Sequence, residues 1–141
     1  EVRCDCWLRA SCTLEDLALS VLTTVIGHQP ERGLLVVDAG WTSVSSDRGT
    51  ATHAVDQAYG MPCSEDGRPL PELLLLATNQ EHGLIGRRDR QPWDLSKHPI
   101  GSRLRILPNH ACATAAMHGE YWVLGEAPGT LQALWTRFPP R

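Results

Sequence analysis

Short apolar runs, separated by polar residues, glycine and proline, make up most of this sequence. Such runs are typical of β-strands, and glycine and proline between them are typical of turns. Residues 17–28 mix helical and β-branched character, and we expect a loop or one short turn that leads into a strand. The other predicted strands are residues 2–9, 34–38, 72–78 and 102–107, with a closing hairpin of residues 120–124 and 131–136.

The segments between the predicted strands are mostly polar. Residues 41–71 contain three glycines, and we expect a long loop with at most one short strand, at residues 53–59. Residues 91–99 carry two prolines and are predicted to form another loop. Residues 111–118 are the best helix candidate, because this segment is rich in alanine and Gly119 can end a helix.

Many short strands with little helix predict a mainly β fold. We expect a small β-barrel or sandwich with one short helix after the His-x-Cys sequence at residues 110–112. A chain of 141 residues is long enough to bury one sizeable core, so residues 1–141 are expected to form a single domain. A fold of this class does not specify a function, which must be inferred from particular residues.

The charged and apolar residues argue against two classes of partner. The net charge is −3, from 13 basic and 16 acidic residues, and the basic residues cluster only at Arg87, Arg88 and Arg90. This pattern does not fit a nucleic-acid-binding protein. The longest apolar run, residues 73–77, is far shorter than the roughly 20 residues of a transmembrane helix, so no membrane association is expected.

The cysteines indicate a reducing compartment. Their number is odd and they form no compact disulfide framework; they are Cys4, Cys6, Cys12, Cys63 and Cys112. This usage fits the cytoplasm better than a secreted domain. The chain begins at Glu1, without a methionine, directly inside strand-like sequence, and it holds a single lysine, Lys97. We therefore expect it to be a piece of a longer polypeptide.

The residues with the most distinctive chemistry are His110 and Cys112, which follow a predicted strand and a proline. A turn there could aim both side chains at one point, and imidazole nitrogen and thiolate sulfur are both good zinc ligands. A site with so few protein ligands leaves positions for water or substrate, which is typical of catalytic metal sites. The competing interpretation is structural, because lone cysteines are often buried and lone histidines often bond to the backbone.

Three motifs follow predicted strands in the order of the chain. They are Asp38-Ala39-Gly40, Gln80-Glu81-His82-Gly83 and Pro108-Asn109-His110-Ala111-Cys112-Ala113-Thr114. Together they resemble the C-terminal β domain of the D-serine dehydratase/D-threonine aldolase family, pyridoxal phosphate (PLP) enzymes related to alanine racemase. The resemblance covers residues 2–135, and its most specific part is Glu-His-Gly followed later by Pro-Asn-His-x-Cys.

The resemblance implies a larger enzyme. Family members have an N-terminal (β/α)8 barrel that carries PLP on a lysine, and their C-terminal β domain closes over the cofactor and supplies a divalent-metal site. By analogy His110 and Cys112 are the metal ligands, zinc is the expected ion with manganese as the alternative, and the protein is a homodimer. Lys97 lies in a proline-flanked loop and is not expected to carry PLP, so the isolated chain should be inactive. Without its barrel, the domain should expose an apolar face and self-associate.

The resemblance also implies the substrates, which are small D-β-hydroxy amino acids. Aldolase-type members typically carry an aspartate where this chain has Cys112, so a D-serine dehydratase-like lyase is favoured over a D-threonine aldolase-like one. Glu81 and His82 are implied to lie near the active site, where they orient the metal ligands through hydrogen bonds. An equally supported interpretation is that Glu81 and His82 only organise their own loop through hydrogen bonds. The alternative of a different class is a non-catalytic β domain with structural His110 and Cys112, used for domain or dimer contacts.

Overall fold

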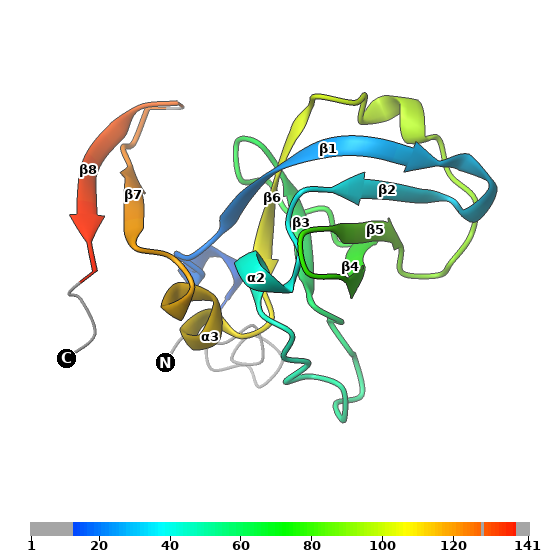
Figure 1. The fold of residues 1–141 in the computed structure, drawn as a ribbon, viewed down its shortest axis with the longest axis horizontal. Coiled ribbons are helices and arrows are strands. Elements are labelled where there is room, and N and C mark those ends of the chain that lie inside the picture. The colour runs from blue at the N-terminus through cyan, green and yellow to red at the C-terminus, as the bar shows by residue number, and fades with distance from the viewer. Residues whose placement is uncertain (1–12, 128, 138–141) are drawn as a thin grey trace.

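The structure, a computed structural model, describes residues 13–127 and 129–137. In this part of the chain six strands form one antiparallel sheet and two form a separate hairpin (Figure 1). The predicted mainly β fold is confirmed, whereas the strand predicted at residues 2–9 lies outside the described residues. The strands of the large sheet are β1 (Val21–Gln29), β2 (Leu34–Val37), β3 (Gly60–Ser64), β4 (Leu73–Thr78), β5 (Gly83–Arg87) and β6 (Arg103–Pro108), in the spatial order β3-β6-β1-β2-β5-β4.

Strand β1 joins the two halves of this sheet. Its first half pairs with β6 and its second half with β2. The register with β2 shifts between Val25 and Gly27, and a bulge of this kind bends a strand. The sheet curls until its outer strands approach one another, and Tyr59, next to β3, donates its backbone N–H to Leu75 of β4 at 3.1 Å. The result is a nearly closed barrel.

Alternate side chains of the strands fill the inside of this barrel. Along β1, Val21, Thr23 and Val25 are buried, whereas Leu22 and Ile26 are exposed, because successive side chains of a strand point to opposite faces. Burial of the inward face fixes the register of each strand, since a shift by one residue would turn the apolar side chains outward. The main core contains Val25, Leu35, Val37, Leu73, Leu75, Ile85, Leu104 and Ile106.

The sequence predicted one short helix, and residues 13–127 and 129–137 contain two. Helix α3 (Ala111–Ala116) is the predicted one, and helix α2 (Trp41–Val44) was not expected. Helix α2 is a single turn whose tryptophan, threonine, serine and valine are all modest helix formers, so the sequence carries no signal for it. No helix within the described residues is long and apolar enough to cross a membrane. The part of the chain that the structure describes also contains the 3-10 turns η1 (Leu14–Asp16), η2 (Pro30–Arg32) and η3 (Leu95–Lys97).

Two strands were misread from the sequence. The strand suggested at residues 53–59 is wrong, because these residues form turns and β3 begins only at Gly60. Strand β5 was not predicted, because its two glycines are typical of loops. Close packing explains both glycines: a Cβ on Gly83 would collide with the carbonyl oxygen of Ala39, and a Cβ on Gly86 would collide with the Leu34 side chain.

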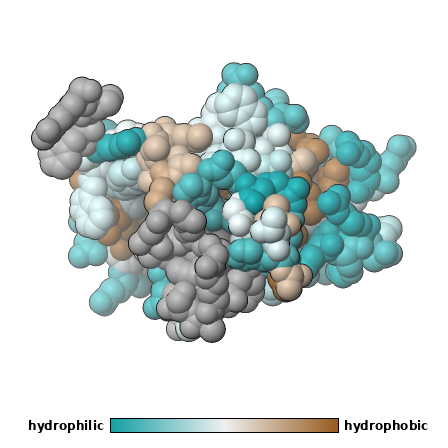
Figure 2. Space-filling view, turned by 90° about the horizontal axis from the view of Figure 1, so that it is seen from below, coloured by the Kyte–Doolittle hydropathy of each residue, from teal (hydrophilic) through white to brown (hydrophobic). Residues whose placement is uncertain are grey.

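The predicted closing hairpin is confirmed, with β7 (Glu120–Leu124) and β8 (Leu131–Thr136) paired with each other and standing away from the barrel (Figure 1). Its side chains are unusually apolar for an exposed hairpin: Trp122 is 59% exposed and Trp135 is 63% exposed, and Leu124, Leu131 and Leu134 are exposed too. Because Trp135 lies opposite Tyr121, the two tryptophans are on opposite faces. On the side of the molecule seen from below, hydrophilic residues break the apolar surface into separate areas (Figure 2).

This hairpin should make the isolated chain self-associate, because exposed apolar area is removed from water when two copies meet. Light scattering at increasing protein concentration is expected to show dimers or larger species. Replacing both Trp122 and Trp135 by glutamine should shift the population toward monomer. The control Ile100→Gln removes a 64% exposed side chain outside the hairpin and should have little effect. A monomer at high concentration for the unmodified chain would contradict the expectation.

Cys63 belongs to a small second cluster with Met61 and Leu107, on the pair of strands β3 and β6. Burial raises the pKa of its thiol to about 11, and the positive charge of Arg105 only partly offsets this. At pH 8 such a pKa leaves on the order of 100-fold fewer thiolates than a pKa of 9.0 would, and only the thiolate is reactive. Iodoacetamide labelling followed by peptide mass spectrometry should therefore find Cys63 nearly unmodified under native conditions and fully modified in urea.

Candidate metal centre

His110 and Cys112 lie where β6 passes into helix α3. His110 is the N-cap of the helix and has an extended backbone, with φ −127° and ψ 97°. Cys112 follows in the first helical turn. The Cys112 side chain is exposed, and the His110 side chain is 27% exposed. Both candidate ligands therefore come from one tight turn at the surface, where an ion or a substrate can reach them.

The His110 ring is held by Asp47, a residue that lies outside all three sequence motifs. Asp47 Oδ2 lies 2.6 Å from His110 Nδ1. An ionised carboxylate can only accept hydrogen bonds, so this contact requires the proton of a neutral ring to sit on Nδ1. The other ring nitrogen, Nε2, then carries the lone pair that binds a metal. Asp47 is 63 residues away in the sequence, so no motif spacing could have found it.

The loop that carries Asp47 is anchored to the residue next to His110. Asn109 is 2% exposed, and its Nδ2 donates to Thr50 Oγ1 at 2.9 Å and to the carbonyl oxygen of Ala58. Thr50 Oγ1 also accepts the Gln57 N–H at 2.8 Å and donates to Asp56 Oδ1 at 3.0 Å. This hydroxyl uses its one donor and both of its acceptor positions. Asn109 thus fixes the turn before His110.

Asp56 stabilises the far end of the same loop. Burial acts to raise its pKa, but hydrogen bonds from the Ala58 N–H, the Thr50 hydroxyl and the Arg48 guanidinium outweigh burial and lower the pKa below its usual value. The carboxylate therefore stays ionised at neutral pH. Its contribution to stability is present above the unfolded-state pKa and is lost only as the pH falls through the lowered folded-state pKa. Ala58, with φ 48°, adopts a left-handed conformation that these bonds hold in place.

Helix α2 holds the other end of the loop against helix α3. Thr114 is fully buried, and its hydroxyl lies 2.9 Å from the carbonyl oxygen of Val44 and 2.9 Å from that of His110. His118 Nε2 lies 2.9 Å from the carbonyl oxygen of Ser43. The segment that precedes Asp47 and the helix that follows His110 are thus bonded directly to one another.

The other two sequence motifs meet at the start of α2. The Trp41 N–H donates to the carbonyl oxygen of Asn79 at 2.9 Å, and the Thr42 hydroxyl donates to that of Gln80 at 2.8 Å. A Cβ on Gly40 would collide with both of these carbonyl oxygens, so the close approach requires glycine. The turn at residues 79–82 is therefore tied to α2, which in turn is bonded to α3.

Glu81 and His82 are both exposed on this turn. Within the described residues, the structure shows no hydrogen bond or ion pair between either side chain and the His110 ring, whose partner is Asp47. Their role beside the active site stays a prediction. Asp38, directly after β2, accepts the Thr23 hydroxyl and the Thr24 N–H on its Oδ1, both at 2.7 Å, and so ties the end of β2 to β1.

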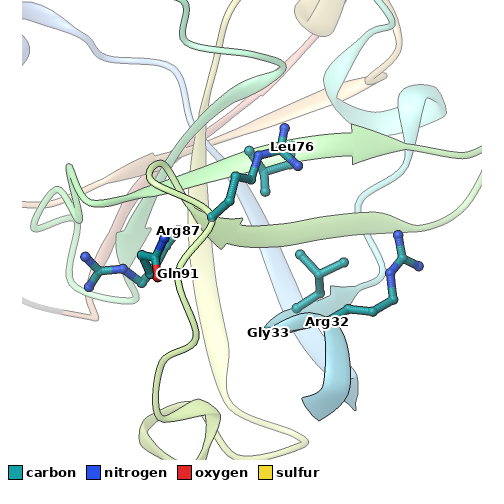
Figure 3. Close-up of a pocket in the computed structure, with 7 residues that line it drawn as sticks. Arg32, Gly33, Leu76, Arg87 and Gln91 are labelled. Carbon is teal, nitrogen blue, oxygen red and sulfur yellow. The ribbon is translucent and has the colours of Figure 1, made fainter.

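A hollow of about 340 Å³ lies elsewhere, at the opposite ends of β2 and β5 (Figure 3). Leu34 pairs with Gly86 there, whereas the motif residues follow Val37 and precede Gly83. Its lining is rich in arginine and offers no metal ligand or nucleophile; the residues are Arg32, Gly33, Leu34, Leu76, Arg87, Arg90 and Gln91. Arg87 is already paired with Asp89. The His110 turn is therefore the stronger candidate for chemistry.

Within residues 13–127 and 129–137, no group of three or more His, Cys, Asp or Glu side chains is arranged to hold a metal ion. A site here would rest on two protein ligands, His110 through Nε2 and Cys112 through Sγ. Imidazole and thiolate suit zinc, and a carboxylate behind the histidine is the usual partner of a metal-binding imidazole. These residues fit a divalent ion whose other coordination positions are taken by water or substrate.

Comparison with known sequences finds relatives that are dehydratases. The chain is 49% identical over 128 residues to D-threo-3-hydroxyaspartate dehydratase from Delftia sp., covering 89% of this chain and 33% of the relative. It is 40% identical over 118 residues to D-serine dehydratase from Dictyostelium discoideum, covering 81% of this chain and 28% of the relative. The chain thus spans about a third of the length of these enzymes. It is also 32% identical to an uncharacterized protein of Mycobacterium tuberculosis, of which it covers 80%.

Solved structures agree with these relatives. The Delftia dehydratase superimposes with a TM-score of 0.86 at 47% identity, covering 92% of this chain and 34% of the enzyme. Two of its variants match with the same TM-score: one has a cysteine replaced by alanine and is in the metal-free form, and the other has a histidine replaced by alanine. In that enzyme the replaced histidine precedes the replaced cysteine by two positions. D-threonine aldolase from Filomicrobium marinum shares the fold, with a TM-score of 0.57 at 24% identity.

The family model described as "Putative serine dehydratase domain" matches residues 18–124, which include β1 to β7 and the His110 turn. This match extends over most of the chain and agrees with both the sequence relatives and the solved structures. The chain therefore belongs to the serine dehydratase domain family.

Proposed function

We propose that this chain is the metal-binding C-terminal domain of a PLP-dependent lyase that acts on D-β-hydroxy amino acids. The observation that carries the proposal is the His110 ring, fixed by Asp47 through Nδ1 so that Nε2 is available, two residues before the exposed Cys112. A purely structural histidine at a helix N-cap would not need its ring oriented by a carboxylate from a distant loop.

The Delftia dehydratase supports the same pair of ligands. Its replaced histidine and cysteine have the spacing of His110 and Cys112, and the structure of its cysteine variant is in the metal-free form. At 47% identity over almost the whole of this chain, a matching pair of residues at a matching spacing is expected to have a matching role. We therefore assign His110 Nε2 and Cys112 Sγ as the protein ligands of the metal.

The proposed ion is zinc, because a thiolate ligand suits zinc better than manganese. When bound, it would act as a Lewis acid on the β-oxygen of the substrate, while PLP on the barrel would delocalise the negative charge that develops at Cα. The residues of this chain would hold the ion and orient its histidine ligand. His110 and Cys112 would fix the position of the ion. Asp47 would orient the imidazole, and Asn109 would hold the loop that carries Asp47 next to His110.

The remainder of the enzyme is proposed to lie outside this chain. The relatives are about three times as long, which leaves room for an N-terminal (β/α)8 barrel with the PLP lysine. Lys97 ends the short turn η3, is exposed, and lies between Asp94 and the loop that leads to β6, so it is not proposed as that lysine. We further propose a cytoplasmic homodimer, in which Glu81 and His82 lie near the active site.

The presence of Cys112 places a D-serine dehydratase-like activity first and a D-threonine aldolase-like activity second. A different class of function is a non-catalytic β domain used for domain or dimer contacts. The observation that favours it is the Mycobacterium tuberculosis relative, most of whose length this domain covers. In that case His110 and Cys112 would be structural and would hold no metal.

Elemental analysis should separate these two classes. Protein purified without chelator is expected to contain close to one zinc per chain, and Cys112→Ala and His110→Ala should each lose most of it, because neither remaining ligand alone holds the ion. His53→Ala, which changes a histidine in the turns outside the site, should keep its zinc. No metal above background in the unmodified protein would exclude the metal-binding proposal.

Assays of the full-length protein should decide the reaction. A dehydratase is expected to release pyruvate and ammonia from D-serine, whereas an aldolase would release glycine and acetaldehyde from D-threonine. We expect pyruvate, and we expect the rate to fall by at least 100-fold in His110→Ala, because the leaving hydroxide would lose its Lewis acid. Glycine without pyruvate would reverse the order of the two candidates.

A further inference from the structure

We propose that Asp47 is the positioning residue of this metal centre: it holds His110 with the proton on Nδ1, so that Nε2 alone faces the ion. The inference rests on the proposed metal-binding function and adds a residue from a loop that none of the three sequence motifs contains. Its basis is the contact of 2.6 Å between Asp47 Oδ2 and His110 Nδ1.

The loop around Asp47 is built to keep this contact. On one side, the carbonyl oxygen of Val44 is bonded to the Thr114 hydroxyl, and the Asp47 N–H donates to Ser45 Oγ at 3.1 Å. On the other side, Thr50 is bonded to Asn109. Val44 and Thr50 lie before and after Asp47 in the sequence, and their partners Thr114 and Asn109 lie after and before His110. The loop is therefore bonded to the backbone around His110 at two points, one on each side of Asp47. Asp47 therefore has little freedom to leave the ring.

The charges nearby leave Asp47 available for this role. The neighbouring cation, Arg48, pairs with Asp56 and also lies over the ring of Tyr59. The Asp47 carboxylate instead lies against the His110 ring. The Asp47 side chain is half exposed, so water screens its charge, and the effect on the ring comes from the directed hydrogen bond more than from long-range attraction.

A carboxylate in this position has two consequences for metal binding. It removes Nδ1 as a competing ligand atom, because that nitrogen carries the donated proton. It also strengthens the bond from Nε2 to a cation, since the negative charge of the carboxylate stabilises the positive charge that the ring gains when it binds the cation. Loss of such a partner typically weakens metal affinity by about 10- to 100-fold.

The test is zinc affinity, measured on the full-length protein by competition with a chromophoric chelator. Asp47→Ala is expected to weaken zinc binding by about 10- to 100-fold, and Asp47→Glu, which keeps a carboxylate, should weaken it less. The matched control is Asp66→Ala, which removes an exposed aspartate paired with Arg68, and it should leave the zinc affinity unchanged. Thermal unfolding of metal-free Asp47→Ala should stay close to that of the parent, because the partner lost is half exposed.

A second measurement does not require the metal. With histidine labelled by ¹⁵N in the metal-free protein, NMR should show a protonated Nδ1 and a bare Nε2 for His110, identified by its absence in His110→Ala. Asp47→Ala should lose this signature. The reverse tautomer in the parent would overturn the inference.

The outcomes distinguish the inference from the proposed function. Zinc affinity that is lost in His110→Ala but unchanged in Asp47→Ala overturns the role of Asp47 and leaves the metal site standing. A parent protein that binds no zinc would exclude both the metal site and the role of Asp47. Weaker zinc binding in Asp47→Ala, with unchanged thermal unfolding and partial recovery in Asp47→Glu, supports the positioning role, because a merely structural residue would change stability instead.

Discussion

The buried amide of Asn109 is the contact on which the arrangement around His110 depends. A buried polar group costs free energy unless it is bonded. Asn109 is 2% exposed, and its Nδ2 donates to Thr50 Oγ1 and to the Ala58 carbonyl oxygen, whereas its Oδ1 has no hydrogen-bond partner among the described residues. Both partners lie in the turns after α2, so the amide fastens that segment to the residue immediately before His110. Ordering a loop of this length costs conformational entropy, and the left-handed backbone of Ala58 adds strain. The ordered loop that carries these costs is the one that places Asp47 beside the His110 imidazole.

The topology brings the three motifs to one end of the barrel. Val37, the last residue of β2, pairs with both Val25 of β1 and Gly83, the first residue of β5. In the neighbouring pair, β1 begins at Val21 opposite Ile106, near the end of β6. Antiparallel pairing therefore sets the exits of β2 and β6 and the turn before β5 on the same side. Helix α2 then connects them, because its N-terminus receives the carbonyl oxygens of the 79–82 turn while its last residue is bonded to Thr114.

Local sequence predicted those elements whose own residues determine them. The hairpin β7–β8, strand β6 and helix α3 follow from apolar runs and from an alanine-rich stretch ended by glycine. Strand β5 was missed because its glycines are required by close contacts with the Ala39 carbonyl oxygen and the Leu34 side chain, which are distant in the sequence. Likewise, the sequence itself pointed to His110 and Cys112, and the family resemblance strengthened that prediction, but Asp47 could not be foreseen. It becomes part of the site only through bonds that close a loop of 63 residues.

The hydrogen bonds around His110 bear on how the proposed metal would bind. A histidine free in solution exchanges its proton between two nitrogens and rotates about two side-chain bonds, and a metal must stop both. Here Asp47 has already selected one nitrogen, and Thr114 and Asn109 hold the backbone on either side. The entropy of orienting this ligand is therefore lost on folding and not on binding. In the proposed site the orientation of the histidine ligand would therefore be set before the ion binds, and Cys112, exposed in the first turn of α3, would supply the second protein ligand.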